Sequence, residues 1–176
     1  VPRTADKLVH FLAPIVLLIP VLLAYAVLPI GRNMTVADYD AGVLFFFAVG
    51  AAVELSVFMA GWSSRNKYSL LGAMRGIAQM ISYEIAMGMS TVCVLLLAGN
   101  VSLNAIITQQ ATVGWNVMVL SIAAFLFLVS AFAETNRVPF DLPEAESELI
   151  AGYHSEYSAM KFSMFPIAEY ANMWTA

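Results

Sequence analysis

Cysteine and histidine are scarce in this chain, and their scarcity excludes several chemistries. The 176 residues include one cysteine and two histidines, which cannot form an internal disulfide or a cluster of metal ligands. His154 has no Cys or His partner at metal spacing, so we predict that it is neither ligand nor switch. The sequence also lacks a phosphate-binding glycine loop, a Cys-x-x-Cys pair and a Gly-x-Ser-x-Gly elbow. We therefore expect no metal or flavin on this chain and no complete active site within it.

Charged residues are also few. They make up 11% of the chain, whereas 61% is hydrophobic; a soluble domain has about 25% and 45–50%. A water-soluble fold could not bury so much apolar surface, which predicts a lipid environment. The net charge of −4 without a Lys/Arg cluster excludes nucleic acid as a partner.

Long apolar segments account for most of the chain. Each approaches the ~20 residues that cross a hydrocarbon core as a helix, and backbone in lipid must be helical or form a closed barrel. We predict an all-α, polytopic transmembrane bundle that forms a single domain over 1–176, with about five spans: roughly 8–28, 41–62, 70–98, 115–133 and 160–176. The fifth span stops unfinished, so we expect a longer protein. Prolines 14 and 20 predict a kink in the first span.

Basic residues indicate the orientation. Seven of the eight Lys and Arg residues fall on one side of the predicted spans, and only Arg32 falls on the other. The positive-inside rule then places the chain's start and the loop over 134–159 in the cytoplasm.

The predicted cytoplasmic loop is rich in acids. It carries six carboxylates and one arginine, Arg137; the acids are Glu134, Asp141, Glu144, Glu146, Glu148 and Glu156. If Pro143 begins a helix, Glu144 and Glu148 share a face one turn apart, and their repulsion should raise the pKa of at least one of them. A proton relay near neutral pH requires such a shift, although a solvated, inert acidic loop explains the composition equally well.

Ionisable residues also occur inside the predicted spans, where charge is costly and usually kept for function. They are Glu54, Arg75 and Glu84, with Glu169 in the incomplete fifth span. On a helical wheel Arg75 and Gln79 share one face and Glu84 lies opposite, so we expect protein or a wet cavity around this helix. Arg75 could instead snorkel to the nearby interface.

Two segments resemble a known family, the quinone-chamber subunits of respiratory complex I, known as the H subunits of NADH-quinone oxidoreductase. They are GWSSRNKYSLLGAMR at 61–75, running on to Ser82-Tyr83-Glu84, and AETNRVPFDLPEAESEL at 133–149, which continues through Gly152-Tyr153-His154 to Ala168-Glu169-Tyr170. The bacterial form of these motifs matches more closely than the mitochondrial form, which implies the bacterial cytoplasmic membrane, crossed several times.

The resemblance implies a role beside a quinone, either ubiquinone or menaquinone, as substrate. It implies partners among the other complex I subunits: the peripheral-arm iron–sulfur and quinone-site subunits and the neighbouring membrane-arm subunits. The residues it places in or beside the quinone chamber are Arg75, Glu134, Arg137, Asp141, Glu144, Glu146 and Glu148. Those it places on a proton path into the membrane arm are Glu84, Glu156 and Glu169. Glu54 departs from the family pattern, where an uncharged residue is expected, so no family role is carried onto it.

Two alternatives stay open at this point. A homologous component of a membrane-bound hydrogenase or other dehydrogenase shares the ancestral bundle, but the Glu-x-Glu-x-Glu run after Pro-Phe-Asp favours the quinone enzyme. A free-standing proton-coupled transporter would be expected to show inverted repeats, and we find no internal repeat.

Overall fold

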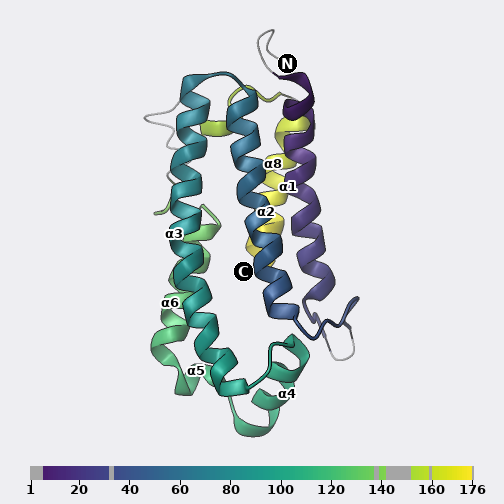
Figure 1. The fold of residues 1–176 in the computed structure, drawn as a ribbon, viewed down its shortest axis with the longest axis vertical. Helices are drawn as coiled ribbons and strands as arrows, with labels where there is room; N and C mark the ends of the chain where they lie inside the picture. The colour runs from purple at the N-terminus through teal and green to yellow at the C-terminus, as the bar shows by residue number, and fades with distance from the viewer. Residues whose placement is uncertain (1–5, 32–33, 137–138, 142–151, 159, 176) are drawn as a thin grey trace.

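Three long apolar helices form the body of the structure (Figure 1). They are α1 (Lys7–Val27), α2 (Gly42–Ser63) and α3 (Lys67–Ala98), each long and apolar enough to cross a membrane. This computed structural model describes residues 6–31, 34–136, 139–141, 152–158 and 160–175, and these contain helices and no strand. The predicted all-α fold is therefore confirmed, and its first three predicted spans coincide with these helices, α3 beginning at Lys67 instead of residue 70.

The fourth predicted span differs from the helices found there. The segment predicted as one helix over 115–133 is two, α5 (Asn116–Val119) and α6 (Ser121–Glu134), because Leu120 between them is not helical (φ −111°, ψ 46°). A further helix, α4 (Leu103–Val113), occupies the preceding connection. The 14 residues of α6 extend about 21 Å, less than the ~30 Å of a hydrocarbon core.

The last part of the chain returns along the bundle. A short 3-10 helix, η1 (Gly152–His154), precedes α8 (Met160–Thr175), which packs on α1. The hydroxyl of Tyr25 in α1 donates to the carbonyl of Ala171 in α8 at 2.6 Å. The beginning of the predicted fifth span thus lies in a helix of 16 residues.

Local sequence explains where α3 begins and ends. The Asn66 side chain accepts a hydrogen bond from the Tyr68 amide at 3.1 Å and caps the helix N-terminus. Gly99 ends the helix with φ of 64°, a left-handed conformation that glycine adopts without strain. By contrast, α1 continues as one helix through Pro14 and Pro20, both of which are buried.

Small residues lie where the long helices meet. Ala13, Ala60 and Ala73 are completely buried, whereas Leu22, Leu44 and Leu96 are more than half exposed on the outside. A Cβ on Gly61 would collide with the side chain of Ala73, which shows how closely α2 approaches α3. Close backbone approach through small residues, with bulky apolar side chains facing outward, is typical of helices packed in lipid.

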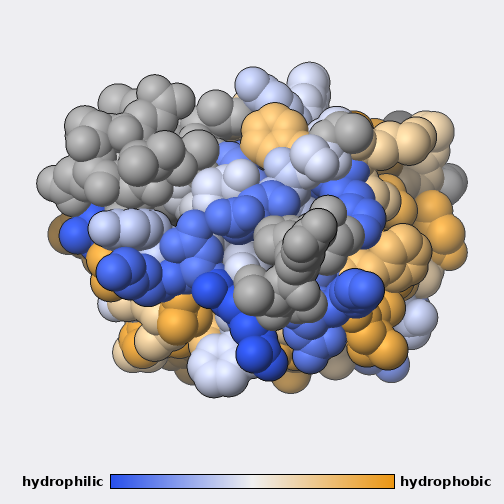
Figure 2. All heavy atoms as spheres, turned by 90° about the horizontal axis from the view of Figure 1, so that it is seen from above, coloured by the Kyte–Doolittle hydropathy of each residue, from blue (hydrophilic) through white to orange (hydrophobic). Residues whose placement is uncertain are grey.

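One end of the bundle is polar. The amide of Asp6 donates to Ser63 O at 3.2 Å, so the start of α1 meets the end of α2 there. The described basic residues Lys7, Arg65, Lys67, Arg75 and Lys161 all lie on or toward this end. Figure 2 shows it as a hydrophilic surface bordered by hydrophobic flanks. The structure thus has the charge asymmetry that the sequence predicts; that this end faces the cytoplasm stays a prediction.

Candidate functional site

The C-terminal end of α6 lies beside the middle of α3, deep in the bundle. Nε2 of Gln79 in α3 donates to the carbonyl of Ala133 at 2.7 Å. Gln79 is twelve residues after Lys67, where α3 begins, which corresponds to about 18 Å along the helix. The loop predicted to start at the membrane surface therefore starts inside the bundle. Non-helical backbone at such a depth requires protein partners for its polar groups.

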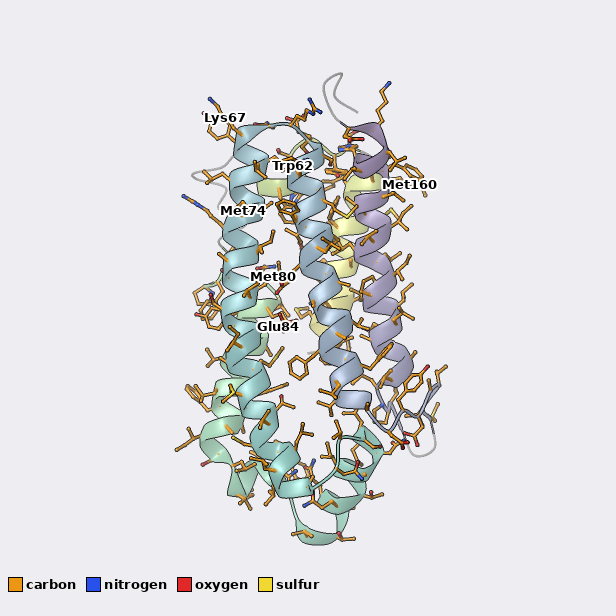
Figure 3. All side chains as sticks on the ribbon, in the orientation of Figure 1. Trp62, Lys67, Met74, Met80, Glu84 and Met160 are labelled. Carbon is orange, nitrogen blue, oxygen red and sulfur yellow. The ribbon has the colours of Figure 1, made fainter. Side chains whose placement is uncertain are left out.

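Three glutamates converge at this depth from three helices. The carboxyl groups of Glu54 in α2 and Glu84 in α3 share a hydrogen bond, and Glu134 at the end of α6 interacts electrostatically with both. Oε1 of Glu134 lies 3.8 Å from where a Cβ on Gly50 would stand, so this carboxyl reaches α2 one turn from Glu54. Figure 3 shows Glu84 pointing from α3 toward the interior of the bundle. We call Glu54, Glu84 and Glu134 the carboxyl cluster.

The carboxyl groups of the cluster act on one another. Two ionised carboxylates are both acceptors only, so a hydrogen bond between Glu54 and Glu84 requires a proton on one of them. All three side chains are partly buried. Carboxyl groups this close interact electrostatically, so a change in the charge of one group acts on the others.

A small cavity adjoins the cluster on the side of α8. Its volume is about 20 Å³, and it is lined by apolar side chains of α1, α2 and α3, such as Leu17, Val57 and Met80, together with the polar residues Glu134, Asn136, Tyr153, Glu169 and Asn172. That volume is enough for about one water molecule with several polar partners. The Tyr153 hydroxyl donates to Oε1 of Glu169 at 2.7 Å. Glu134 and Glu169, far apart in the sequence, thus line the same small cavity.

Glu156 lies apart from this cavity, at the polar end of the bundle. It accepts a hydrogen bond from Nδ2 of Asn66 at 2.8 Å. Its neighbour Tyr157 stacks on His10 with ring centroids 3.9 Å apart and lies 3.3 Å from the Ser63 hydroxyl. Ser69 donates to the Tyr153 carbonyl at 2.8 Å. These contacts fasten the segment 152–157 to the ends of α1, α2 and α3.

Burial sets the protonation of two side chains in this segment. Burial raises the pKa of Tyr157, which the hydrogen bond with Ser63 partly opposes, so the phenol stays protonated at neutral pH. Burial lowers the pKa of His154, whose ring lies against Tyr153, Phe162 and Phe165. His154 is therefore neutral at neutral pH and packs as an aromatic side chain.

The remaining predicted site residues are only partly placed. Arg75 is half-buried on α3, one turn before Gln79, and Asp141 follows Phe140 at the end of the turn after α6. Arg137, Glu144, Glu146 and Glu148 lie outside the described residues. Within the described ranges, no group of three His, Cys, Asp or Glu side chains could hold a metal ion.

Sequence reasoning missed three parts of this site. The sequence indicated that Glu54 is a charged residue inside a span, but it did not reveal Glu84 as its partner. That pairing depends on how α2 packs on α3. Tyr153 occurs in a matching motif, but only the fold brings its hydroxyl to Glu169. Gln79 shared a helical face with Arg75, a signal for a polar contact that did not reveal the turn it binds.

Apolar spanning helices around interior carboxyl groups define the class, a polytopic helical membrane protein with ionisable groups in its core. The family model described as NADH dehydrogenase matches residues 1–176, and the chain belongs to this family.

Three relatives carry closely related names. The chain is 48% identical over 180 residues to NADH-quinone oxidoreductase subunit 8 of Rhodothermus marinus, covering 100% of this chain and 53% of the relative. It is 45% identical over 179 residues to the NADH-quinone oxidoreductase H subunit of Salinibacter ruber (strain DSM 13855 / M31), and the match covers 99% of this chain and 52% of the relative. It is 46% identical over 175 residues to the NADH-quinone oxidoreductase H subunit of Rickettsia rickettsii (strain Iowa), and the match covers 98% of this chain and 51% of the relative.

These similarities confirm the resemblance noted in the two motifs. The chain spans about half the length of the curated relatives it matches. All three names describe subunits of NADH-quinone oxidoreductases.

Proposed function

We propose that this chain forms part of the quinone chamber of a proton-translocating NADH:quinone oxidoreductase and of the acidic path that couples quinone reduction to proton pumping. The observation that carries this proposal is the carboxyl cluster: three glutamates from three helices meet inside an apolar bundle. Isolated acids at such depth are costly, and a set of them is usually kept for ion movement. Family membership names the enzyme in which that movement would be used.

The roles divide along the chain. Arg75, Glu134 and Asp141, with Arg137, Glu144, Glu146 and Glu148 outside the described residues, would line or flank the chamber for ubiquinone or menaquinone. Glu84 and Glu169, with Glu54 as an added member, would receive protons from Glu134 through the cluster and the adjoining cavity. Glu156 would serve nearer the polar end, where it accepts a hydrogen bond from Asn66.

The coupling in this proposal is electrostatic. Reduction of the quinone changes the charge beside Glu134, and the cluster responds as a unit because its members interact strongly. A proton then moves between the cluster and Glu169, with the cavity supplying room for one bridging water. Partner subunits of the complex would supply the electrons and hold the quinone headgroup, in the cytoplasmic membrane of a bacterium.

Neutralising the cluster tests the proposal. Glu84→Gln and Glu134→Gln, each in the full-length protein within the assembled complex, keep side-chain shape but remove the titrating carboxyl. We expect quinone-dependent NADH oxidation and proton pumping to fall at least about tenfold. Oxidation of NADH by an artificial acceptor that takes electrons before the quinone should not change.

A matched control comes from the opposite end of the bundle. Asp40 is exposed in the connection before α2, so Asp40→Asn removes one carboxylate without touching the cluster and should leave both activities intact. Wild-type pumping in both cluster variants would refute the proposed path.

A further inference from the structure

The chain that follows α6 makes a turn against α3. We call residues 133–136 and 139–141 the acidic turn, because Glu134 lies near its start and Asp141 at its end. Helices leave their last four carbonyl groups without partners inside the helix. At the depth of Gln79, those carbonyls and the turn's own polar groups have to find partners within the protein.

The side chain of Gln79 provides hydrogen-bond partners for several of these polar groups. Gln79 is 5% exposed. Its Nε2 lies 2.7 Å from the carbonyl of Ala133, 2.8 Å from the carbonyl of Phe140 and 3.2 Å from Oδ1 of Asn136. The amide has two protons, so it shares them among three acceptors. A single residue of α3 thereby ties the start of the acidic turn to its end.

Neighbouring residues on α3 complete the attachment. Asn136 has a left-handed backbone, with φ of 50°, and its Nδ2 lies 3.9 Å from the sulfur of Met80. The ring of Tyr83 meets Phe140 edge to face, with centroids 5.3 Å apart. These contacts are apolar or weak, whereas the hydrogen bonds that Gln79 donates are directional contacts between α3 and the described residues of the turn.

We propose that Gln79 is a positioning residue that anchors the acidic turn and so fixes Glu134 against Glu54 and Glu84. Through the carbonyl of Phe140 it also holds the end of the turn that carries Asp141 against α3. Gln79 acts through these carboxylates and itself carries no proton in the reaction. The inference rests on the proposed function for the use of Glu134 and Asp141, but the anchoring can be measured without it.

The experiment uses the full-length protein in the purified, assembled complex. Gln79→Leu removes the donors at similar volume, and Gln79→Glu turns the donor into an acceptor that faces three other acceptors. Ser82→Ala is the matched control, because the Ser82 hydroxyl is exposed and bonds only to Ala78 of its own helix. Hydrogen–deuterium exchange of backbone amides over 133–141 reports on anchoring, and quinone kinetics across pH report on positioning.

We expect exchange in the turn to rise about tenfold or more in both Gln79 variants, since the hydrogen bonds that hold the two ends of the turn on α3 are lost, and to stay unchanged in Ser82→Ala. The kcat for quinone should fall severalfold with little change in KM, and its pH profile should shift because Glu134 leaves the cluster. A purely structural defect would lower the amount of assembled complex without moving the pH profile.

If Gln79→Leu does not assemble, Gln79→Asn, which is one methylene shorter, provides a graded version with a smaller rise in exchange. Unchanged exchange in the turn for every assembled Gln79 variant would overturn the anchoring. Raised exchange with wild-type kcat and pH profile would instead overturn the proposed function of the turn's carboxylates.

Discussion

The two halves of this bundle use the same helices but are packed by different means. In the half toward the polar end, buried small residues such as Ala60 and Ala73 bring α2 and α3 together, and hydrogen bonds tie in residues 133–136, 139–141 and 152–157. The cavity beside the carboxyl cluster is about 20 Å³, and a more open hollow of about 310 Å³ lies at the polar surface beside Trp62 and Arg65. In the other half, α2, α3, α4 and α6 surround a groove of about 420 Å³.

The difference lies in what lines each space. The large groove is bordered mostly by bulky apolar side chains such as Phe46, Phe47 and Val94, with few polar groups. In lipid, apolar side chains gain little by leaving the membrane for a helix interface, so close packing depends on small residues and interhelical hydrogen bonds. The helices pack closely where the sequence supplies small residues and interhelical hydrogen bonds. The carboxyl cluster lies in this closely packed half.

The largest effect should come from adding one methyl group where α2 meets α3. A Cβ on Gly61 would collide with Ala73 and lie 3.1 Å from the Ser69 carbonyl. We expect Gly61→Ala to lower stability by about 1–3 kcal/mol. Gly88 lies in the same type of helix, and a Cβ there meets nothing within 4 Å, so Gly88→Ala should be neutral or stabilise by up to about 1 kcal/mol. Thermal melting of the purified complex measures both, and equal melting temperatures would remove the contrast between the halves.

A smaller contrast is expected from enlarging one alanine in each half. Ala73 is fully buried, so Ala73→Leu should cost about 1–3 kcal/mol through overpacking. Ala124 borders the large groove, and Ala124→Leu should cost less than about 0.5 kcal/mol, as substitutions away from packed features do. The yield of assembled complex after a heating series compares them. An equal loss would contradict the contrast in packing between the two halves.

The smallest effect should be a dependence on pH at His154. Burial holds its pKa below the ordinary 6.5, so the unfolded state binds a proton more readily than the folded one. The contribution of His154 to the free energy of unfolding is therefore fully present above about pH 6.5 and declines as the pH falls below that value. His154→Phe cannot titrate and should flatten this part of the melting-temperature curve between pH 8 and 5. Parallel curves for the two proteins would contradict the assignment.

Much of the fold follows from local sequence. Apolar length predicted the three long helices, and Asn66 and Gly99 mark the ends of α3. The break at Leu120 was not predicted, because the run over 115–133 is mostly apolar and carries no glycine or proline inside it. The position of α6 beside Gln79 was also out of reach, since hydropathy gives the length of a helix and not its depth.

The candidate site was predictable in its residues but not in its geometry. The motifs identified Glu84, Glu134 and Glu169, and the structure brings Glu134 to Glu84 and places it with Glu169 around one cavity. The same motifs grouped Glu156 with Glu84 and Glu169 on the proton path, whereas in the fold it lies at the polar end with Asn66. Pairings between helices depend on the rotation and depth of each helix, which periodicity leaves open.

By itself, the sequence determined that the chain is helical, belongs in lipid and carries several acids within its apolar segments. These properties are sums over single residues and their nearest neighbours, so composition and spacing suffice to establish them. Only the tertiary structure decided that Glu54 binds Glu84, and that Gln79 holds the turn carrying Glu134. Hydrogen bonds require their atoms within about 3 Å, and only packing can bring together residues that lie as far as 146 positions apart in this chain.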